Sequence, residues 1–171
     1  MENTKFKIAF VKKTFFEKHK DFIKMLDPNN LDKQGKRGYL FLKVVYEGNN
    51  LLVPLRSNIE PLKPYGVIGH RVSSKKRPNA GLDYRYILVI NKMEYLEFPS
   101  EYTLPKGQQT ILNNNLEKIE REVKAYVKGY VSAAVKGLVK NKPKYRESSL
   151  QNFNEELGVI EKKDRKERIK L

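Results

Sequence analysis

The stretch RGYLFLKVVYEGNNLLVPLRSN, residues 37–58, decides the fold that we predict for this chain. Residues 39–46 and 51–55 are mostly apolar or β-branched, as in paired strands, and the Glu-Gly-Asn-Asn segment between them is typical of a tight turn. We therefore expect a β-hairpin. The polar residues Arg56, Ser57 and Asn58 follow its second strand directly. Because functional side chains often lie on short loops held by rigid strands, this end of the hairpin is the candidate site.

The composition fits one folded domain with a large excess of positive charge. The 171 residues are 39% hydrophobic and 11% aromatic, which suffices for a buried core. The net charge is +15 at pH 7, whereas magnitudes of about 2–8 are typical of a small domain. This charge, with Tyr and Phe interleaved among the basic residues, favours a nucleic-acid partner over a well-solvated surface alone. We expect one domain over residues 1–160 and a charged tail, frayed or disordered, over residues 161–171.

The residue types that are missing exclude several classes of site. The chain has no cysteine, which excludes a disulfide framework, a thiolate nucleophile and a zinc–thiolate site. No apolar run approaches the ~18 residues of a membrane span. Lys12 and Lys13 also interrupt the apolar residues near the N-terminus, so no signal core follows it. We therefore expect no membrane partner and a cytoplasmic location.

The rest of the chain predicts an α+β fold, a sheet with surrounding helices. Short strands are expected at residues 6–10 and 67–72, and the apolar run within residues 85–91 predicts a central strand buried on both faces, with residues 94–98 beside it. Apolar residues at helical spacing predict a helix over residues 14–26 and a long C-terminal helix over residues 108–140 that Pro143 ends. Residues 29–36 are predicted as a polar loop. The segment 148–151 resembles a capping box that opens a short helix, which Gly158 closes.

Cleavage of RNA without a metal ion is the chemistry that the remaining residue types favour. The chain has no glycine-rich phosphate loop and no cluster of His, Asp or Glu at metal-binding spacing, so we expect no metal and no cofactor. In metal-free cleavage the substrate's own 2′-hydroxyl attacks the phosphate. The protein must then move two protons and stabilise the charge that builds on the phosphate. Arginine suits the phosphate because its planar fork stays charged, and histidine or lysine suits proton transfer.

These requirements select residues around the end of the hairpin. The catalytic candidates are Arg56 and Ser57, with Lys63 or His70 from the following loop as acid or base. Simpler interpretations also fit: Ser57 as a turn residue that caps a backbone amide, His70 as a structural histidine, and Asp83 as a turn residue or an arginine partner. Basic residues that are either RNA-binding or solvated are Lys36, Arg37, Arg71, Lys75, Lys76 and Arg77.

Four pieces of the sequence, in order, resemble the toxins of type III toxin–antitoxin systems, the ToxN/AbiQ group, and most closely its TenpN branch. They are RGY at residues 37–39, VPLRSNI at 53–59, GLDY at 81–84 and SLQNFNEELG at 149–158. Similarity to that group implies a compact, strongly twisted, partly barrel-like antiparallel sheet with surrounding helices. It also implies a sequence-selective endoribonuclease that is toxic when free and leaves a 2′,3′-cyclic phosphate.

The resemblance implies partners and residue roles as well. The implied partners are an antitoxin RNA of pseudoknot repeats, whose precursor the toxin processes, and cellular or phage mRNA as substrate. Toxin and antitoxin would form a closed protein–RNA hetero-oligomer, and some members abort phage infection. Because Pro-Leu-Arg-Ser matches the family's Pro-Leu-Thr-Ser, the resemblance implies an active-site role for Ser57. Ile59 stands where the ToxN branch has a candidate catalytic lysine, which leaves proton transfer to Lys63 or His70.

Two other function classes share some of these features. A non-catalytic basic RNA-binding module would have the same charge and aromatic content, and it would leave bound RNA intact. A DNA-binding regulator is disfavoured, because no helix-turn-helix pair with a basic recognition helix stands out.

Overall fold

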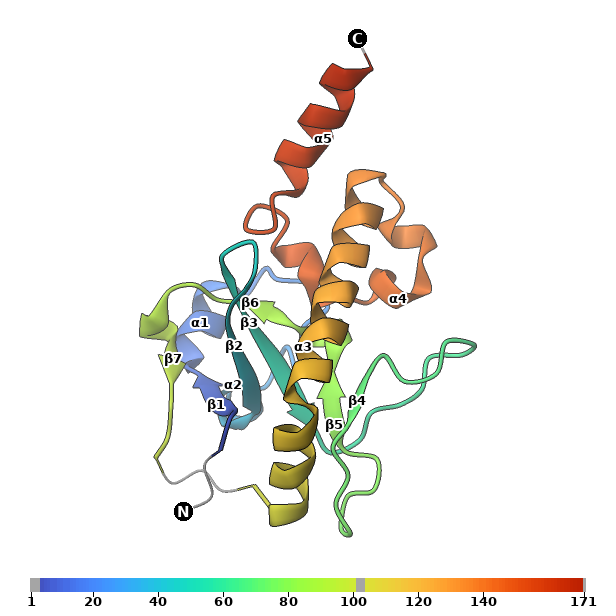
Figure 1. The fold of residues 1–171 in the computed structure, drawn as a ribbon. Coiled ribbons are helices and arrows are strands. Elements are labelled where there is room, and N and C mark those ends of the chain that lie inside the picture. The colour runs from blue at the N-terminus through green and yellow to red at the C-terminus, as the bar shows by residue number, and fades with distance from the viewer. Residues whose placement is uncertain (1–3, 101–103, 171) are drawn as a thin grey trace.

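An antiparallel sheet forms the centre of the computed structural model, which describes residues 4–100 and 104–170 (Figure 1). Within these residues the strand order is β4-β5-β3-β2-β1-β7, β6 pairs with β3 outside this path, and the sheet does not close on itself. The predicted α+β class is confirmed. The strands are β1 (Lys7–Val11), β2 (Gly38–Tyr46), β3 (Asn49–Arg56), β4 (Gly69–Arg71), β5 (Gly81–Asp83), β6 (Leu88–Val89) and β7 (Leu96–Glu97).

The predicted hairpin is confirmed, with a shorter turn. β2 and β3 pair as far as Tyr46 opposite Asn49, and only Glu47 and Gly48 connect them. Both connecting residues have positive φ, +47° and +79°, as a type I′ turn requires. Asn49 and Asn50, which we predicted in the turn, are instead buried residues of β3. The Asn49 amide donates to the carbonyl of Glu156 at 2.9 Å, so tertiary contacts extend the strand.

Within the predicted strand at residues 85–91 the apolar residues 87–90 are buried, but the prediction of a continuous central strand is wrong. The run begins inside a 3₁₀ helix, η1 (Tyr84–Tyr86), and only Leu88 and Val89 join the sheet, as β6. The hydroxyl of Ser149 donates to the carbonyl of Ile87 at 2.6 Å, so a side chain satisfies a backbone group that a neighbouring strand would otherwise take. β3, which pairs with β2, β5 and β6, is the central strand.

The other short strands lie where the sequence predicts them, with one change of partner. The predicted strands at residues 6–10 and 67–72 correspond to β1 and β4. The strand predicted at residues 94–98 corresponds to β7, but β7 pairs with β1 rather than with the run at residues 85–91. A second 3₁₀ helix, η2 (Met93–Tyr95), precedes β7, and the carbonyl of Tyr95 accepts a hydrogen bond from the amide of Lys12 at 2.8 Å.

The predicted helix over residues 14–26 is much shorter in the structure. α1 (Lys13–Lys18) has six residues, and the chain then turns, with positive φ at Lys24 and Asp27. The ring of His19 stacks on Phe22 with 4.4 Å between centroids. The apolar residues at helical spacing therefore pack as an aromatic cluster around a turn.

The segment 29–36, predicted as a polar loop, contains a helix instead. α2 (Leu31–Lys36) begins after Asn30, whose side chain accepts a hydrogen bond from the amide of Lys33 at 3.1 Å. Asparagine is among the best N-cap residues, because its side-chain oxygen satisfies an unpaired amide of the first turn. The helix matters for function because it carries Lys33 and Lys36 to the end of the hairpin.

The predicted long helix is confirmed as α3 (Lys106–Val135), which crosses the front of the sheet in Figure 1. It ends near Gly137, which has a φ of +69°, because glycine adopts the left-handed conformation that closes a helix. It therefore does not continue to Pro143, which begins the short helix α4 (Pro143–Arg146). None of the helices in the described residues is long and apolar enough to cross a membrane.

The end of the chain forms short helical segments and one charged helix. Two 3₁₀ helices, η3 (Val139–Asn141) and η4 (Ser149–Asn152), flank α4, and the predicted capping box opens η4 rather than an α-helix. Gly158 precedes α5 (Val159–Ile169) instead of closing a helix. α5 covers most of the predicted charged tail and projects from the rest of the molecule (Figure 1).

Candidate functional site

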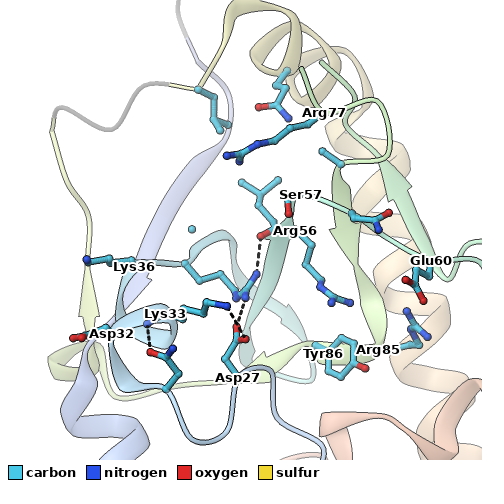
Figure 2. A pocket seen from close by; sticks show the side chains of 18 of the residues that line it. Asp27, Asp32, Lys33, Lys36, Arg56, Ser57, Glu60, Arg77, Arg85 and Tyr86 are labelled. Atoms are coloured by element: carbon cyan, nitrogen blue, oxygen red, sulfur yellow. Dashed lines mark hydrogen bonds and ion pairs between the residues drawn. The ribbon is translucent and has the colours of Figure 1, made fainter. Parts of the chain in front are cut away.

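A groove of about 1030 Å³ opens at the end of the hairpin, where β3 ends (Figure 2). Its walls come from α2 and the start of β2, the residues after β3, the loop between β4 and β5, η1 and the first turn of α3. Three carboxylates line it, those of Asp27, Asp32 and Glu60, against six cationic side chains. This excess of positive charge in a concave site favours an anionic ligand. The cations are Lys33, Lys36, Arg37, Arg56, Arg77 and Arg85.

The buried carboxylate of Asp83, at the end of β5, holds two of these arginines. Its Oδ2 atom accepts hydrogen bonds from Arg56 Nη1 at 2.8 Å and from Arg85 Nη2 at 3.2 Å. Its Oδ1 atom accepts from Arg85 Nε at 3.2 Å and from the Arg85 backbone amide at 3.1 Å. Asp83 has an exposed fraction of 0%, so its charge has to be paired within the protein. The pairing fixes both guanidinium groups while their side chains still line the groove.

The environment of Arg85 keeps its guanidinium charged. Burial lowers the pKa of Arg85, but the hydrogen bonds and the negative charge of Asp83 outweigh burial, so the pKa lies above its ordinary value. A guanidinium has five N–H groups, so an arginine that a buried carboxylate holds still has N–H groups left to donate to a ligand.

Tyr86 lies against both of these arginines. The guanidinium carbons of Arg56 and Arg85 lie 5.3 Å and 5.5 Å from the centre of its ring, within the range of cation–π contacts. Figure 2 shows Tyr86 next to Arg85, with the side chain of Arg56 extending toward both. One phenol and two guanidinium groups therefore share one part of the groove.

Arg37 has a largely structural position on the opposite wall. It pairs with Asp27 through Nη2, and its Nη1 atom donates to the carbonyl of Leu55 at 3.3 Å. Its Nε atom is buried and has no acceptor in the part of the chain that the structure describes. Arg37 thus ties the turn before α2 to the end of β3 and shapes the groove.

Ser57 lies at the rim of the groove, directly after Arg56. It is exposed, and within residues 4–100 and 104–170 its hydroxyl makes no hydrogen bond. The simpler interpretation of Ser57 as a cap for a backbone amide is therefore not supported. A hydroxyl without an internal partner is available to a ligand.

The structure brings together five of the predicted site residues and separates the others from them. The five that line the groove are Lys36, Arg37, Arg56, Ser57 and Arg77. The predicted residues that do not line it are Lys63, His70, Arg71, Lys75 and Lys76.

Neither His70 nor Lys63, predicted as the acid or base, has its side chain in the lining of the groove. His70 Nδ1 lies 3.1 Å from Glu122 Oε1 on α3, and the His70 side chain is only 14% exposed. This is the structural histidine that we weighed as the simpler interpretation. Lys63 is exposed in the loop between β3 and β4. Arg71 donates from Nη1 to the carbonyl of Asn79 at 2.8 Å, which orders the neighbouring loop.

The basic loop at residues 73–79 contributes one side chain to the groove. Ser74 and Arg77 exchange backbone hydrogen bonds at 3.1 Å, which closes the loop into a tight turn. Lys75 and Lys76 lie at the exposed tip of this turn. Figure 2 shows Arg77 extending across the groove above Ser57.

The sequence analysis missed three groove residues with cationic or aromatic side chains: Lys33, Arg85 and Tyr86. Lys33 was assigned to a loop and the other two to a buried strand. The Asn30 cap was a usable signal for α2. Another was the proximity of Asp83 and Arg85 in the sequence, because an aspartate often hydrogen-bonds to the backbone two residues later.

Within the described residues, no group of three or more His, Asp or Glu side chains could hold a metal ion. No protein-family model, curated protein or solved structure matches the chain. The groove and the sequence motifs therefore carry the functional inference.

Proposed function

We propose that this protein is a metal-independent endoribonuclease and the toxin of a type III toxin–antitoxin system. The observation that carries the proposal is the arrangement at the end of β3. There Ser57, whose hydroxyl makes no hydrogen bond to any described residue, follows an arginine, Arg56, that buried Asp83 holds in place. The groove around them has an excess of cations. Three of the four pieces that resemble the ToxN/AbiQ group, at residues 37–39, 53–59 and 81–84, contribute side chains to the groove or to the Arg56–Asp83 pair and support the same function.

In the proposed mechanism one RNA phosphodiester lies against Arg56 and Arg85. Their N–H donors match its non-bridging oxygens and stabilise the charge that grows as the substrate's 2′-oxygen attacks phosphorus. The Ser57 hydroxyl donates a further hydrogen bond to the same phosphate. Arg77 and Lys36 bind neighbouring phosphates, which fixes the position of the strand. The products are a fragment with a 2′,3′-cyclic phosphate and a fragment with a 5′-hydroxyl.

The proposal includes the partners that the family resemblance implies. The antitoxin is an RNA of pseudoknot repeats that binds the groove and blocks it, in a closed protein–RNA hetero-oligomer. The toxin processes the precursor of this RNA, and its targets in the cytoplasm are cellular or phage mRNA, which gives it a role in abortive infection. The net charge of +15 supports tight binding of a folded RNA, because release of counterions from phosphates drives such binding.

The direct test is incubation of the purified protein with single-stranded RNA in EDTA. We expect the RNA to be cut, and we expect the matching DNA, which lacks the 2′-hydroxyl, to stay intact. Arg56→Gln should lower the cleavage rate at least about 100-fold, because preorganised charge stabilisation is worth that much. Lys140→Gln, which removes the same charge from an exposed position in η3, should stay within about twofold of wild type. Binding without cleavage would reject the nuclease and favour a non-catalytic RNA-binding module.

Growth of cells that express the protein tests the toxin role. Wild-type protein should stop growth, and Ser57→Ala should relieve the arrest while RNA binding is retained. If short tandem repeats precede the gene, co-expression of their RNA should restore growth. Unchanged toxicity of Ser57→Ala would remove Ser57 from the mechanism.

A further inference from the structure

The proposed cleavage needs a proton donor for the leaving 5′-oxygen, and the groove restricts the choice. The cations Arg56 and Arg85 are poor donors, because guanidinium groups do not lose protons in proteins. Two of the groove carboxylates are already engaged. Asp27 pairs with Arg37, and Asp32 pairs with Lys13 at 2.6 Å.

Among the remaining groups, Tyr86 is placed where the phosphate would bind. Its ring lies against both guanidinium groups that would hold the phosphate, at 5.3 Å and 5.5 Å from their carbon atoms. A phosphate bound by Arg56 and Arg85 is therefore close to the phenol. The Tyr86 hydroxyl makes no hydrogen bond within the described residues, so it can donate to a ligand.

From this geometry we infer that Tyr86 is the general acid of the cleavage reaction, an assignment that rests on the proposed nuclease function. The 2′-oxygen forms a bond to phosphorus and releases its proton to water in the open groove. The bond from phosphorus to the 5′-oxygen breaks, and the Tyr86 hydroxyl gives its proton to that oxygen. The phenolate then regains a proton from water, so the enzyme returns to its starting state.

The two arginines have a second role in this step. Their guanidinium carbons lie 5.3 Å and 5.5 Å from the centre of the Tyr86 ring, so the same two groups that would bind the phosphate also hold the phenol beside it. Asp83 acts as a positioning residue, because its carboxylate holds Arg56 and Arg85 together. One arrangement of side chains thus serves both the phosphate and its leaving group.

A stacking role for Tyr86 is the main alternative, and the Tyr86→Phe variant separates the two roles. Phenylalanine keeps the ring, which stacks on a nucleobase or a guanidinium, and removes only the hydroxyl that carries the proton. If the ring alone matters, Tyr86→Phe keeps full activity. If the proton matters, it loses a large part of the rate, on the order of 100-fold to 10,000-fold for a general acid.

The decisive experiment compares ordinary RNA with RNA that has a 5′-bridging sulfur at the cleaved bond. A thiolate leaves without protonation, so the sulfur substrate does not need a general acid. We expect Tyr86→Phe to cut ordinary RNA about 100-fold or more slowly than wild type, to cut the sulfur substrate at nearly the wild-type rate, and to bind ordinary RNA with unchanged affinity. Tyr65→Phe, which alters an exposed tyrosine outside the groove, should match wild type on both substrates.

The outcomes separate this assignment from the proposed function. Wild-type cleavage with full activity of Tyr86→Phe on ordinary RNA overturns the role of Tyr86 and leaves the nuclease intact. An equal loss on both substrates, or a loss that weaker RNA binding explains, also overturns the general-acid role. If wild-type protein cuts neither substrate, the nuclease and the Tyr86 assignment are both rejected.

Discussion

Replacing Asp83 with asparagine tests whether a buried carboxylate holds the two arginines of the groove. Asparagine keeps the shape of the side chain but places an amide NH₂ where Oδ2 accepts from Arg56 and Arg85. Two charge-assisted hydrogen bonds, worth about 1.5–3 kcal/mol each, become contacts between donors. The Arg56 side chain is 28% exposed and can turn toward water, whereas that of Arg85 is 12% exposed. With the Arg56 bond taken at the lower end of this range, we expect the free energy of unfolding to fall by about 3–4.5 kcal/mol.

Urea unfolding followed by circular dichroism measures this loss. The midpoint should fall at an unchanged slope, because the folded chain still buries the same surface. The control is Glu47→Gln, which neutralises the exposed pair with Lys162. We expect this control to change the stability by about 1 kcal/mol at most. If Asp83→Asn loses no more than Glu47→Gln, the carboxylate does not hold the arginines as described.

Three further predictions concern the fold. A Cβ at Gly129 would lie 2.0 Å from the Tyr145 hydroxyl. Overpacking of this kind costs about 2 kcal/mol, whereas alanine gains about 1 kcal/mol over glycine in helix propensity. Gly129→Ala should therefore lower the free energy of unfolding by about 1 kcal/mol, which thermal unfolding measures. Tyr145→Phe added to it should recover part of the loss, and no recovery would place the clash elsewhere. Ser149→Ala leaves the buried carbonyl of Ile87 without its 2.6 Å donor, which should cost about 1–3 kcal/mol in urea unfolding; an unchanged midpoint would contradict this. Burial lowers the pKa of His19 from 6.5, so the unfolded chain binds more protons and stability should fall as the pH drops through 6.5. The His19→Asn variant should lose less between about pH 7.5 and pH 5.5, and an equal loss would exclude His19 as the cause.

Local sequence patterns predicted the hairpin and the long helix because each is built mainly from local signals. The apolar strands around a glycine turn and the three- or four-residue spacing in α3 do not depend on distant partners. The boundaries of the strands, in contrast, depend on contacts with residues far away in the sequence. Asn49 and Asn50 have the composition of a turn, and the first of them becomes a strand residue because its amide reaches Glu156. Similarly, the carbonyl of Ile87 accepts a hydrogen bond from the hydroxyl of Ser149 rather than from a neighbouring strand, so the predicted strand is shortened there.

In the candidate site, too, residues placed by local sequence were predicted and their distant partners were not. Arg56 and Ser57 were predicted because they directly follow a strand, and local order fixes them at its end. Asp83, the partner of Arg56, is 27 residues away along the chain, so spacing alone did not show that it would hold Arg56. His70 was expected at the groove because it is near in sequence, but β4 directs it to Glu122 on α3. Nearness in sequence does not fix the side of a sheet on which a side chain lies.

Analysis of the fragment ends produced from single-stranded RNA in EDTA tests the central claim most directly. Attack by the substrate's own 2′-hydroxyl in the groove predicts a 2′,3′-cyclic phosphate on each upstream fragment and a 5′-hydroxyl on each downstream fragment. Fragments that carry 3′-hydroxyl and 5′-phosphate ends, or RNA that stays intact with folded protein, would contradict the account.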